Sequence, residues 1–410
     1  MSSLVQPHYY DTMKILLVTE RYWPEVGAAP SRLANMAEGL KLKGCEVDVL
    51  TSLPNYPKGE IFTDYKGSFF KKEIPNGVSL FRYWIYATVS HNPIARIFNM
   101  FSFAFMIWLF AFKVGKIKSY DRIIIQTPTL VVAASAMILF KKLYRKKCIL
   151  NVSDIWPLTA VDMGAIKEGS WSFKFLSMLE RFLYRNADGI LGQSQEILDH
   201  ISTFKSSNKF FLYRNLQYYD LSSSCKHKTQ PLKVVFSGML GVAQDVAGIV
   251  KNVPFKKLGV EFHIFGGGKQ LEEIQSWISA NPNSNVYAHG FVPKEEISQK
   301  LSEMDVSIVP LATRIRGAVP SKIYDTLPQG LPILFCGGGE GATFISSRNL
   351  GLVSEPGDYD ALYKNIETFS KMLSSEYEEF SKRCFDVSRT ELNFDRQLED
   401  TVAFLRHEIE

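Results

Sequence analysis

The sequence predicts an α/β protein with two doubly wound, Rossmann-like domains facing a central cleft. Short, nearly continuous apolar runs alternate with helical stretches along the chain, as is typical of parallel strands buried on both faces. A polar segment interrupts this alternation once, after which the same pattern starts again. A length of 410 residues is sufficient for two such domains.

The strands follow from the apolar runs. In the first set we expect strands at 14–19, 46–51, 122–126, 148–152 and 188–192, and in the second at 233–237, 261–265, 285–289, 306–309 and 332–335. A helix is expected over 31–43, ending at Gly44. The tail from about residue 360 has helical periodicity.

The domain boundaries follow from the interruption. Residues 1–12 are expected to be an extension, 13–215 the first domain and 233–390 the second. The linker is 216–232, which is polar and contains Ser222–Ser224 and Pro231. Residues 391–410 are expected to form a C-terminal helix that can pack back on the first domain.

Composition excludes several classes of protein. The five cysteines are far apart and none forms a C-x-x-C pair, so no zinc site or disulfide framework is predicted. The start of the chain lacks the apolar core of a secretory signal.

Charge divides unevenly between the two parts. Residues 1–230 hold 29 Lys+Arg and 18 Asp+Glu (net +11), and the remainder holds 18 and 24 (net −6). The basic part indicates an anionic partner, which could be a nucleic acid, an anionic membrane or a phosphorylated substrate. A few solvated lysine clusters would give the same count.

The stretch Met100–Phe112 is apolar and rich in aromatic residues, and lysines follow it. About 20 apolar residues are needed to span a bilayer, so this run is expected to be too short. One interpretation places it in a membrane interface through Phe105, Trp108 and Phe112. The other buries it as a crossover helix between the sheet and its neighbours.

The second set contains the most informative motif, Pro320-Ser321-Lys322 followed by Asp325. A helix N-terminus at Ser321 offers unpaired N–H groups to a phosphate, with Lys322 beside it. A carboxylate one turn later can accept bonds from ribose hydroxyls. An ordinary strand–helix–strand unit with a proline at the helix start would look similar.

Other segments follow the expected strands: Tyr22–Arg32, Thr51–Gly59, Asn151–Pro157, Phe236–Asp245 and Gly266–Gly268. In this order, and with the Pro320–Asp325 segment, they resemble the GT-B retaining glycosyltransferases of family 4. The resemblance covers residues 13 to about 393 and is strongest to the WbuB-like N-acetylfucosamine transferases, which build O-antigen and capsule repeat units.

The resemblance implies that the second domain binds a nucleotide-sugar, with UDP as the expected nucleotide, and that no metal is required. Lys322, Arg316 and the helix start at Pro320 and Ser321 would balance the diphosphate, although Arg314 and Arg316 could equally lie in a solvated loop. Asp325 would hold the ribose. The remaining donor-binding candidates are Gly238, Gly241, Gln244, Gly266, Phe291 and Val292.

The resemblance also implies that the first domain binds the acceptor. The candidates are Gly27, Ala28, Arg32, Asn55 and Trp156. Asp154 is the candidate catalytic residue, because it would orient the acceptor or face the sugar; a helix N-cap ahead of Trp156-Pro157 is the equal alternative. No enzymic nucleophile is expected.

The chain departs from the family pattern at two places. Most members carry two glutamates eight residues apart, and here these positions hold Gly317 and Asp325. Gln244 stands without the Arg and Lys that many members present. The missing glutamate suggests a deoxy or N-acetylamino sugar, and it also keeps open a degenerate protein that only binds nucleotide-sugar or scaffolds a membrane assembly.

The expected activity is that of a metal-independent hexosyltransferase acting on a polyprenyl-diphosphate-linked glycan in O-antigen or capsule synthesis. The expected location is cytoplasmic, on the inner face of the bacterial cytoplasmic membrane. An NAD-dependent dehydrogenase is disfavoured because no G-x-G-x-x-G follows the first strand. The carboxylates and histidine of a nucleotide-sugar epimerase are not evident, and no nucleic-acid module is visible.

Overall fold

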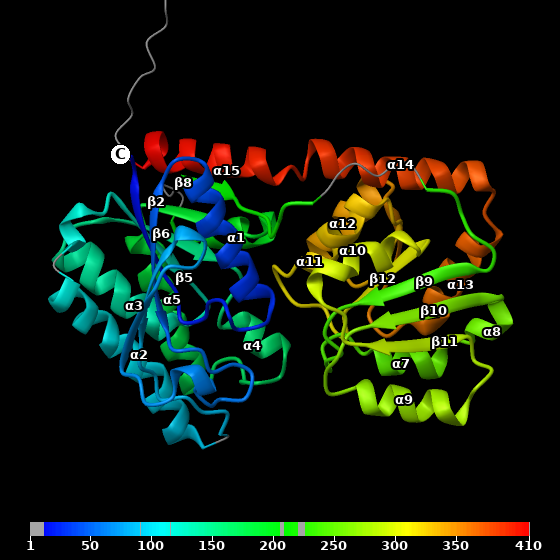
Figure 1. Ribbon diagram of the computed structural model, residues 1–410, viewed down its shortest axis with the longest axis horizontal. Helices are drawn as coiled ribbons and strands as arrows, with labels where there is room; N and C mark the ends of the chain where they lie inside the picture. The colour runs from blue at the N-terminus through cyan, green and yellow to red at the C-terminus, as the bar shows by residue number, and fades with distance from the viewer. Residues whose placement is uncertain (1–11, 91, 115, 206–208, 220–225, 410) are drawn as a thin grey trace, which may run out of the picture.

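The computed structural model describes residues 12–90, 92–114, 116–205, 209–219 and 226–409. Within them the chain forms two α/β domains, each on its own sheet (Figure 1). The predicted pair of doubly wound domains is confirmed. The expected extension, 1–12, lies outside the described residues except for its last residue.

The N-terminal sheet has eight strands in the order β3-β4-β2-β1-β5-β6-β7-β8, parallel except for the β3–β4 pair. The strands are β1 (Lys14–Val18), β2 (Glu46–Ser52), β3 (Phe70–Glu73), β4 (Ser79–Tyr83), β5 (Arg122–Gln126), β6 (Lys147–Val152), β7 (Gly189–Gly192) and β8 (Lys209–Leu212). The prediction found the central strands and missed β3, β4 and β8. Strands β3 and β8 are four residues long and lie at the sheet edges, where the burial pattern that marks a strand is weak.

Helices cover both faces of this sheet. They are α1 (Ala28–Leu42), α2 (Pro93–Val114), α3 (Leu130–Ala136) continued by η4 (Met137–Leu143), α4 (Leu158–Asp162), α5 (Trp171–Asn186) and α6 (Gln195–Ser202). Helices α2, α3 and α5 share one hydrophobic core with the sheet, and α1 packs into the core on the other face. The predicted helix ending at Gly44 is α1.

The C-terminal sheet has six parallel strands in the order β11-β10-β9-β12-β13-β14. They are β9 (Leu232–Ser237), β10 (Val260–Phe265), β11 (Val286–Gly290), β12 (Val306–Pro310), β13 (Ile333–Cys336) and β14 (Gly351–Ser354). Its helices are α7 (Val246–Asn252), α8 (Phe255–Leu258), α9 (Leu271–Ala280), α10 (Lys294–Ser302), α11 (Ser321–Thr326) with η5 (Leu327–Gln329), α12 (Gly339–Ser347) and α13 (Tyr359–Lys371). All five strands expected here are present.

The chain ends by returning to the N-terminal domain. Helix α14 (Ser374–Thr390) lies along the C-terminal domain, and α15 (Phe394–Ala403) with η6 (Phe404–Glu408) lies along the other (Figure 1). Leu398 packs so closely on Gly39 of α1 that a Cβ there would lie 2.8 Å from its Cδ2. The ammonium of Lys43 also pairs with Asp395 at 2.7 Å.

The first connection between the domains is bonded to α15, the helix that follows the second connection. Residues 213–231 lead out of β8, and 391–393 lead from α14 into α15. The Gln397 side chain accepts from the Arg214 amide at 3.0 Å and donates to the Arg214 carbonyl at 3.1 Å. The rings of Tyr218 and Phe394 also meet, with centroids 4.8 Å apart.

Candidate functional site

The topology places the site between the domains. In each sheet the strand order reverses beside the domain's first strand, β1 or β9. Ligands of such sheets bind outside the carboxyl ends of the strands at this reversal. The arrowheads of β9, β10 and β11 point toward the N-terminal domain (Figure 1).

Lys322 is the central cation of the C-terminal half of the site. It lies one residue into α11, and its ammonium is 5.5 Å from the centroid of the Phe236 ring. Among the described residues its ammonium has no hydrogen-bond or ion-pair partner. Burial lowers the pKa of Lys322, an effect that the charge of Asp325 partly opposes. A largely buried cation without a bonded partner favours an anionic ligand.

Gly238 makes room for this lysine. It has φ +143°, and a Cβ here would lie 2.8 Å from the Lys322 ammonium and closer still to Cε. Gly266 abuts the Gly238 carbonyl, so the loops after β9 and β10 touch there. Lys322, Gly238 and Gly266 are therefore brought together as the sequence predicts, and glycine at 238 serves the lysine as well as any ligand.

Gln244 and Gly241 extend this loop. A Cβ on Gly241 would lie 3.0 Å from the Gln244 side-chain oxygen. A small hollow, partly open to solvent, borders Gln244 at the carboxyl ends of β12 and β13. This hollow adjoins the loop that follows β9.

Helix α11, whose N-terminus the sequence suggests as a phosphate-binding site, is short. It spans six residues, starts after Pro320 without a side-chain cap, and continues as a 3₁₀ turn. A helix dipole acts through its first turn and builds up over many peptides, so Ser321 offers less than a long helix would. The charge of Lys322 is the stronger anion-binding feature.

Asp325 already has partners. The Tyr219 hydroxyl and the Gln217 amide, at 3.1 Å, donate to the same carboxylate oxygen of Asp325. Both donors come from the connection between β8 and β9. The sequence did not suggest these contacts.

Arg316 has a different partner from the one expected. It forms bonds from Nε at 3.1 Å and from Nη2 at 2.6 Å to the Asp162 carboxylate of α4. Burial alone would raise the pKa of Asp162, but the bonds from Arg316 outweigh it and lower the pKa. The guanidinium therefore ties the two domains together and does not point at a diphosphate. Arg314 approaches Glu196 at 3.9 Å and is largely exposed.

Gly317 is packed against the N-terminal domain. Its φ is +75°, and a Cβ would lie 2.8 Å from Ile197 and 2.9 Å from Ile155. The Ser194 hydroxyl donates to its carbonyl at 2.8 Å. A glutamate cannot occupy this position in this arrangement, because the neighbouring domain takes the space.

The loop after β11 holds Phe291 and Val292. Phe291 is 74% exposed, whereas Val292 packs on the cluster that contains Phe265 and Leu301. The Phe291 ring is thus open to a ligand, and Val292 anchors the loop.

Asp154 and Arg32 face each other at the base of the N-terminal half. No helix begins at Asp154, since α4 starts at Leu158 without a side-chain cap, so the N-cap alternative is wrong. Burial raises the pKa of Asp154, and the charge of Arg32 and a bond from Ser153 oppose this. Ile155, the next residue, contacts Gly317, which places Asp154 beside the C-terminal domain.

Arg32 is buried and cannot reach an acceptor in this arrangement. Only 4% of its surface is exposed. With the Gln193 amide oriented to satisfy both groups, its oxygen accepts from Arg32 Nε at 2.7 Å. Burial lowers the pKa of Arg32 to about 10, against the effect of Asp154. The structure therefore gives Arg32 the role of balancing Asp154.

The remaining acceptor candidates mainly shape loops. The Asn55 amide donates to the Leu53 carbonyl at 3.0 Å, and its backbone N–H donates to Glu25 at 2.8 Å. Gly27 caps the start of α1, whose first residue is Ala28. Trp156 is half-buried against the core. Asn55 thus points into its own loop, contrary to the prediction.

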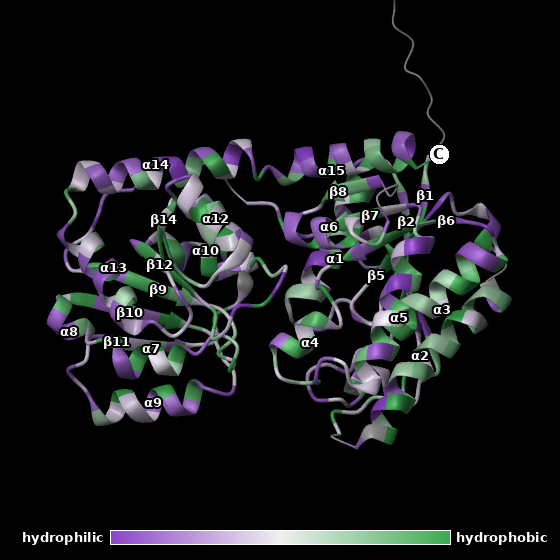
Figure 2. Ribbon diagram, turned by 180° about the vertical axis from the view of Figure 1, so that it is seen from behind, coloured by the Kyte–Doolittle hydropathy of each residue, from purple (hydrophilic) through white to green (hydrophobic). Residues whose placement is uncertain are grey.

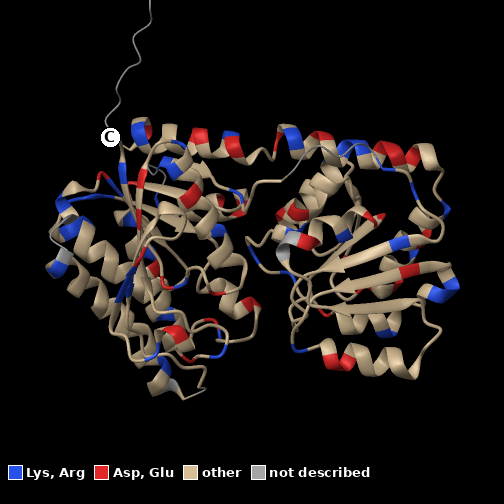
Figure 3. Cartoon of the chain, viewed as in Figure 1, with Lys and Arg blue, Asp and Glu red and all other residues tan. Residues whose placement is uncertain are grey.

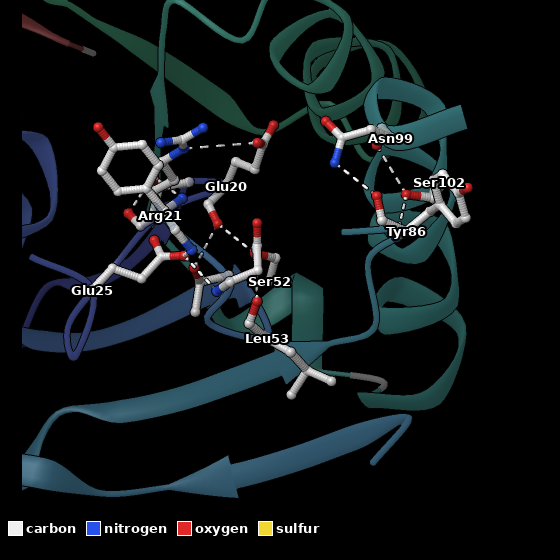
Figure 4. A network of polar contacts seen from close by, with 12 residues as sticks. Glu20, Arg21, Glu25, Ser52, Leu53, Tyr86, Asn99 and Ser102 are labelled. Atoms are coloured by element: carbon white, nitrogen blue, oxygen red, sulfur yellow. Dashed lines mark hydrogen bonds and ion pairs between the residues drawn. The ribbon is translucent and has the colours of Figure 1, made fainter. Parts of the chain in front are cut away.

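Two buried carboxylates were missed: Glu20, which follows β1, and Glu25. Figure 4 shows Glu20 beside Arg21, 4.0 Å away, and the Ser52 hydroxyl donating to the Glu20 carbonyl at 2.7 Å. Burial raises the pKa of Glu20 to about 7. A single glutamate after a strand is not part of a recognisable motif, so the burial of Glu20 could not be predicted from the sequence.

Glu20 predicts a pH-dependent stability. Its pKa is raised from 4.5 to about 7, so the folded state binds more protons across this range and loses stability as pH rises. The loss by pH 8 is on the order of 3 kcal/mol. Glu20→Gln mimics the protonated form, so melting curves at pH 5 and pH 8 should show the variant gaining stability over wild type at pH 8. An equal difference at both pH values would contradict this.

Helix α2 has an exposed apolar stripe. Its members are Ile94, Ile97, Phe98, Phe101, Phe105 and Phe112. The opposite face, with Phe103, Ile107 and Phe110, is buried. Trp108 is not in the stripe, because its indole donates to Ser135 of α3 at 3.0 Å.

The apolar run that was expected to be too short to span a membrane is part of a longer helix, α2. Residues 94–113 suffice by length and composition, because the helix begins earlier than the run that the sequence emphasised. A third of the most apolar stretch is buried against the protein. Figure 2 shows α2, mainly green, at the outside of its domain.

Comparisons with known proteins agree with this geometry. Residues 27–209 match the glycosyl transferase 4-like domain, and residues 231–371 match the glycosyl transferases group 1. The chain is 26% identical over 338 residues to WcaI of Escherichia coli (strain K12), named for colanic acid biosynthesis, covering 78% of this chain and 82% of that protein.

Solved structures share the fold. Sucrose-phosphate synthase of Thermosynechococcus elongatus superposes with a TM-score of 0.72 at 13% identity, covering 97% and 99% of the two chains. HepE of Anabaena, solved with UDP-glucose, superposes with a TM-score of 0.63 at 15% identity, and the match covers 95% of this chain and 99% of HepE. One glycosyltransferase model matches the N-terminal domain and another matches the C-terminal domain, and the chain belongs to the GT-B glycosyltransferases of the family 4 type.

Proposed function

We propose that this glycosyltransferase moves a hexose from a UDP-sugar to a glycan on polyprenyl diphosphate, in O-antigen or capsule synthesis, with retention at the anomeric carbon. The observation that carries the proposal is Lys322, a largely buried ammonium without a bonded partner, at the carboxyl ends of the C-terminal strands. Such a cation suits the diphosphate of a nucleotide-sugar.

The comparisons support the substrate classes. HepE, a protein of the same fold, was solved with UDP-glucose, which favours a UDP-linked donor. WcaI is named as a putative glycosyl transferase of colanic acid biosynthesis, and WaaG, a solved structure of the same fold, as a glycosyltransferase involved in lipopolysaccharide biosynthesis; these names favour a pathway of this kind. We further propose a WbuB-like preference for an N-acetylated or deoxy sugar, since no glutamate fits at Gly317.

In the proposed reaction the bond between the anomeric carbon and the UDP oxygen breaks while the acceptor hydroxyl bonds to the same face of that carbon. The acceptor proton passes to the leaving diphosphate. Lys322 stabilises the charge that develops there, and Asp154 orients the acceptor. We propose that no metal takes part. Among the described residues no group of three His, Cys, Asp or Glu is arranged as a metal site.

Calorimetric titration with UDP, GDP and a panel of UDP-sugars tests the donor. We expect UDP to bind, one UDP-sugar to bind more tightly, and chelation by EDTA to leave transfer unchanged. Binding without any turnover on lipid-linked acceptors would instead favour the degenerate protein that Gly317 keeps open. Absence of UDP binding would reject the proposal.

We propose that the α2 stripe lies in the interface of the inner membrane, with the protein on the cytoplasmic side. Its buried face packs on α3 and the sheet, so the helix presents only one apolar face outward. Lysines and arginines are spread over the same domain, blue in Figure 3. They include the exposed residues Lys113, at the end of α2, and Lys142, in η4. Positive charge beside an apolar stripe suits anionic lipid.

Replacing Phe98 and Phe105 together by serine tests the membrane contact. Both side chains are more than half exposed, so the fold should keep its melting temperature. Each phenylalanine contributes about 1.5 kcal/mol or more when buried, so vesicle binding should fall at least about a hundredfold. The measurement is co-sedimentation with vesicles containing anionic lipid.

Leu42→Ser is the matched control. Leu42 is 73% exposed on α1, which covers the other face of the sheet, so its loss should leave sedimentation unchanged. If the double variant and the wild type bind vesicles equally well, the stripe does not contact the membrane.

A further inference from the structure

The connection between the domains reaches into the nucleotide half of the site. Tyr219 lies in this connection, and its hydroxyl donates to one carboxylate oxygen of Asp325. The Gln217 amide donates to the same oxygen at 3.1 Å and to the Tyr219 oxygen at 2.5 Å. The three side chains thus form a closed triangle of hydrogen bonds.

The triangle is shielded from solvent. All three side chains are at least partly buried, and burial and the Asp325 charge raise the pKa of Tyr219 well above its ordinary value. The phenol therefore stays protonated and remains a donor at any pH at which the protein works. Bonds to a charged acceptor are stronger than neutral ones, which makes this contact a firm restraint.

Asp325 shares its helix with Lys322. The two residues are three apart on α11, and each feels the charge of the other. If Lys322 holds the diphosphate, Asp325 lies within one helical turn of it, which suits the adjoining ribose. Fixing one oxygen of Asp325 fixes the plane of the carboxylate, and with it the direction of the second oxygen.

We propose that Tyr219, supported by Gln217, is a positioning residue that sets the Asp325 carboxylate for recognition of the nucleotide's ribose. The inference rests on the proposed UDP-sugar donor. It adds a specificity residue from outside the donor-binding domain, so selection of a ribonucleotide depends on the segment that joins the two domains.

The test compares UDP with 2′-deoxy-UDP and 3′-deoxy-UDP by calorimetry. Wild type should prefer UDP to at least one deoxy analogue by about tenfold. Tyr219→Phe should weaken UDP binding about three- to tenfold and leave that analogue nearly unchanged, so the preference collapses. Gln217→Met should give a smaller change in the same direction.

Tyr218→Phe is the matched control, because the Tyr218 hydroxyl donates to Asp395 at 3.3 Å instead of to Asp325. It should keep wild-type preference. Tyr219→Phe and Gln217→Met that retain the full UDP preference would overturn the inference while leaving the donor proposal standing. A wild type that binds no UDP would overturn both.

Discussion

Lys322→Ala is expected to lower transfer by about 10²- to 10³-fold, the largest effect of any single change proposed for this protein. The ammonium has no bonded partner among the described residues, so its charge is available to the leaving diphosphate. Loss of one preorganised donor to developing negative charge raises the barrier by about 3–4 kcal/mol. The measurement is UDP release with the donor sugar that calorimetry selects.

Two controls separate chemistry from folding. Lys257→Ala removes an exposed lysine of α8 in the same domain and should leave transfer unchanged. Lys322→Ala itself should keep or raise the melting temperature, because burying an ammonium is unfavourable. Unaltered transfer by Lys322→Ala would show that another group carries the diphosphate.

Asp154→Asn is expected to reduce turnover about a hundredfold while changing the donor KM by less than about threefold. The side chain keeps its shape but loses the charge that would orient or polarise the acceptor hydroxyl. The next residue, Ile155, contacts Gly317, where the two domains meet. The comparison needs purified variant and wild type at saturating acceptor.

Because Arg32 is buried opposite Asp154, the single change also leaves a cation without its counter-charge. The double variant Asp154→Asn with Arg32→Gln restores neutrality. If Asp154 acts on the substrate, the double variant should regain stability and stay slow. If the aspartate only balances Arg32, turnover should return with stability.

The fold could be predicted from the sequence because its central strands are continuous apolar runs, such as Arg122–Gln126. The burial of these runs follows from their composition alone. The proximity of Lys322, Gly238 and Gly266 could also be predicted, because each belongs to a local motif that follows a strand or starts a helix. Edge strands such as β3 were not predicted, because a half-exposed strand of four residues does not form a continuous apolar run.

Where the structure gives a site residue a role that differs from the prediction, the reason is a contact between segments that are distant in the sequence. Arg316 is 154 positions from Asp162 and Tyr219 is 106 positions from Asp325, and no local pattern encodes either pair. Arg32 and Asn55 were assigned to the acceptor by motif position, but burial gives their polar groups to Gln193 and Leu53. Burial of a polar side chain depends on tertiary packing, which a single sequence does not display.

The paired connections between the domains limit how the molecule can open. A single flexible tether would let one domain twist and swing in any direction. Here Gln397 bonds to both the amide and the carbonyl of Arg214, and the Tyr218 ring meets Phe394, so the first crossing is held against α15, the helix that follows the second crossing. Opening is therefore expected to rotate the domains about these residues, and it has to break the ion pair between Arg316 and Asp162.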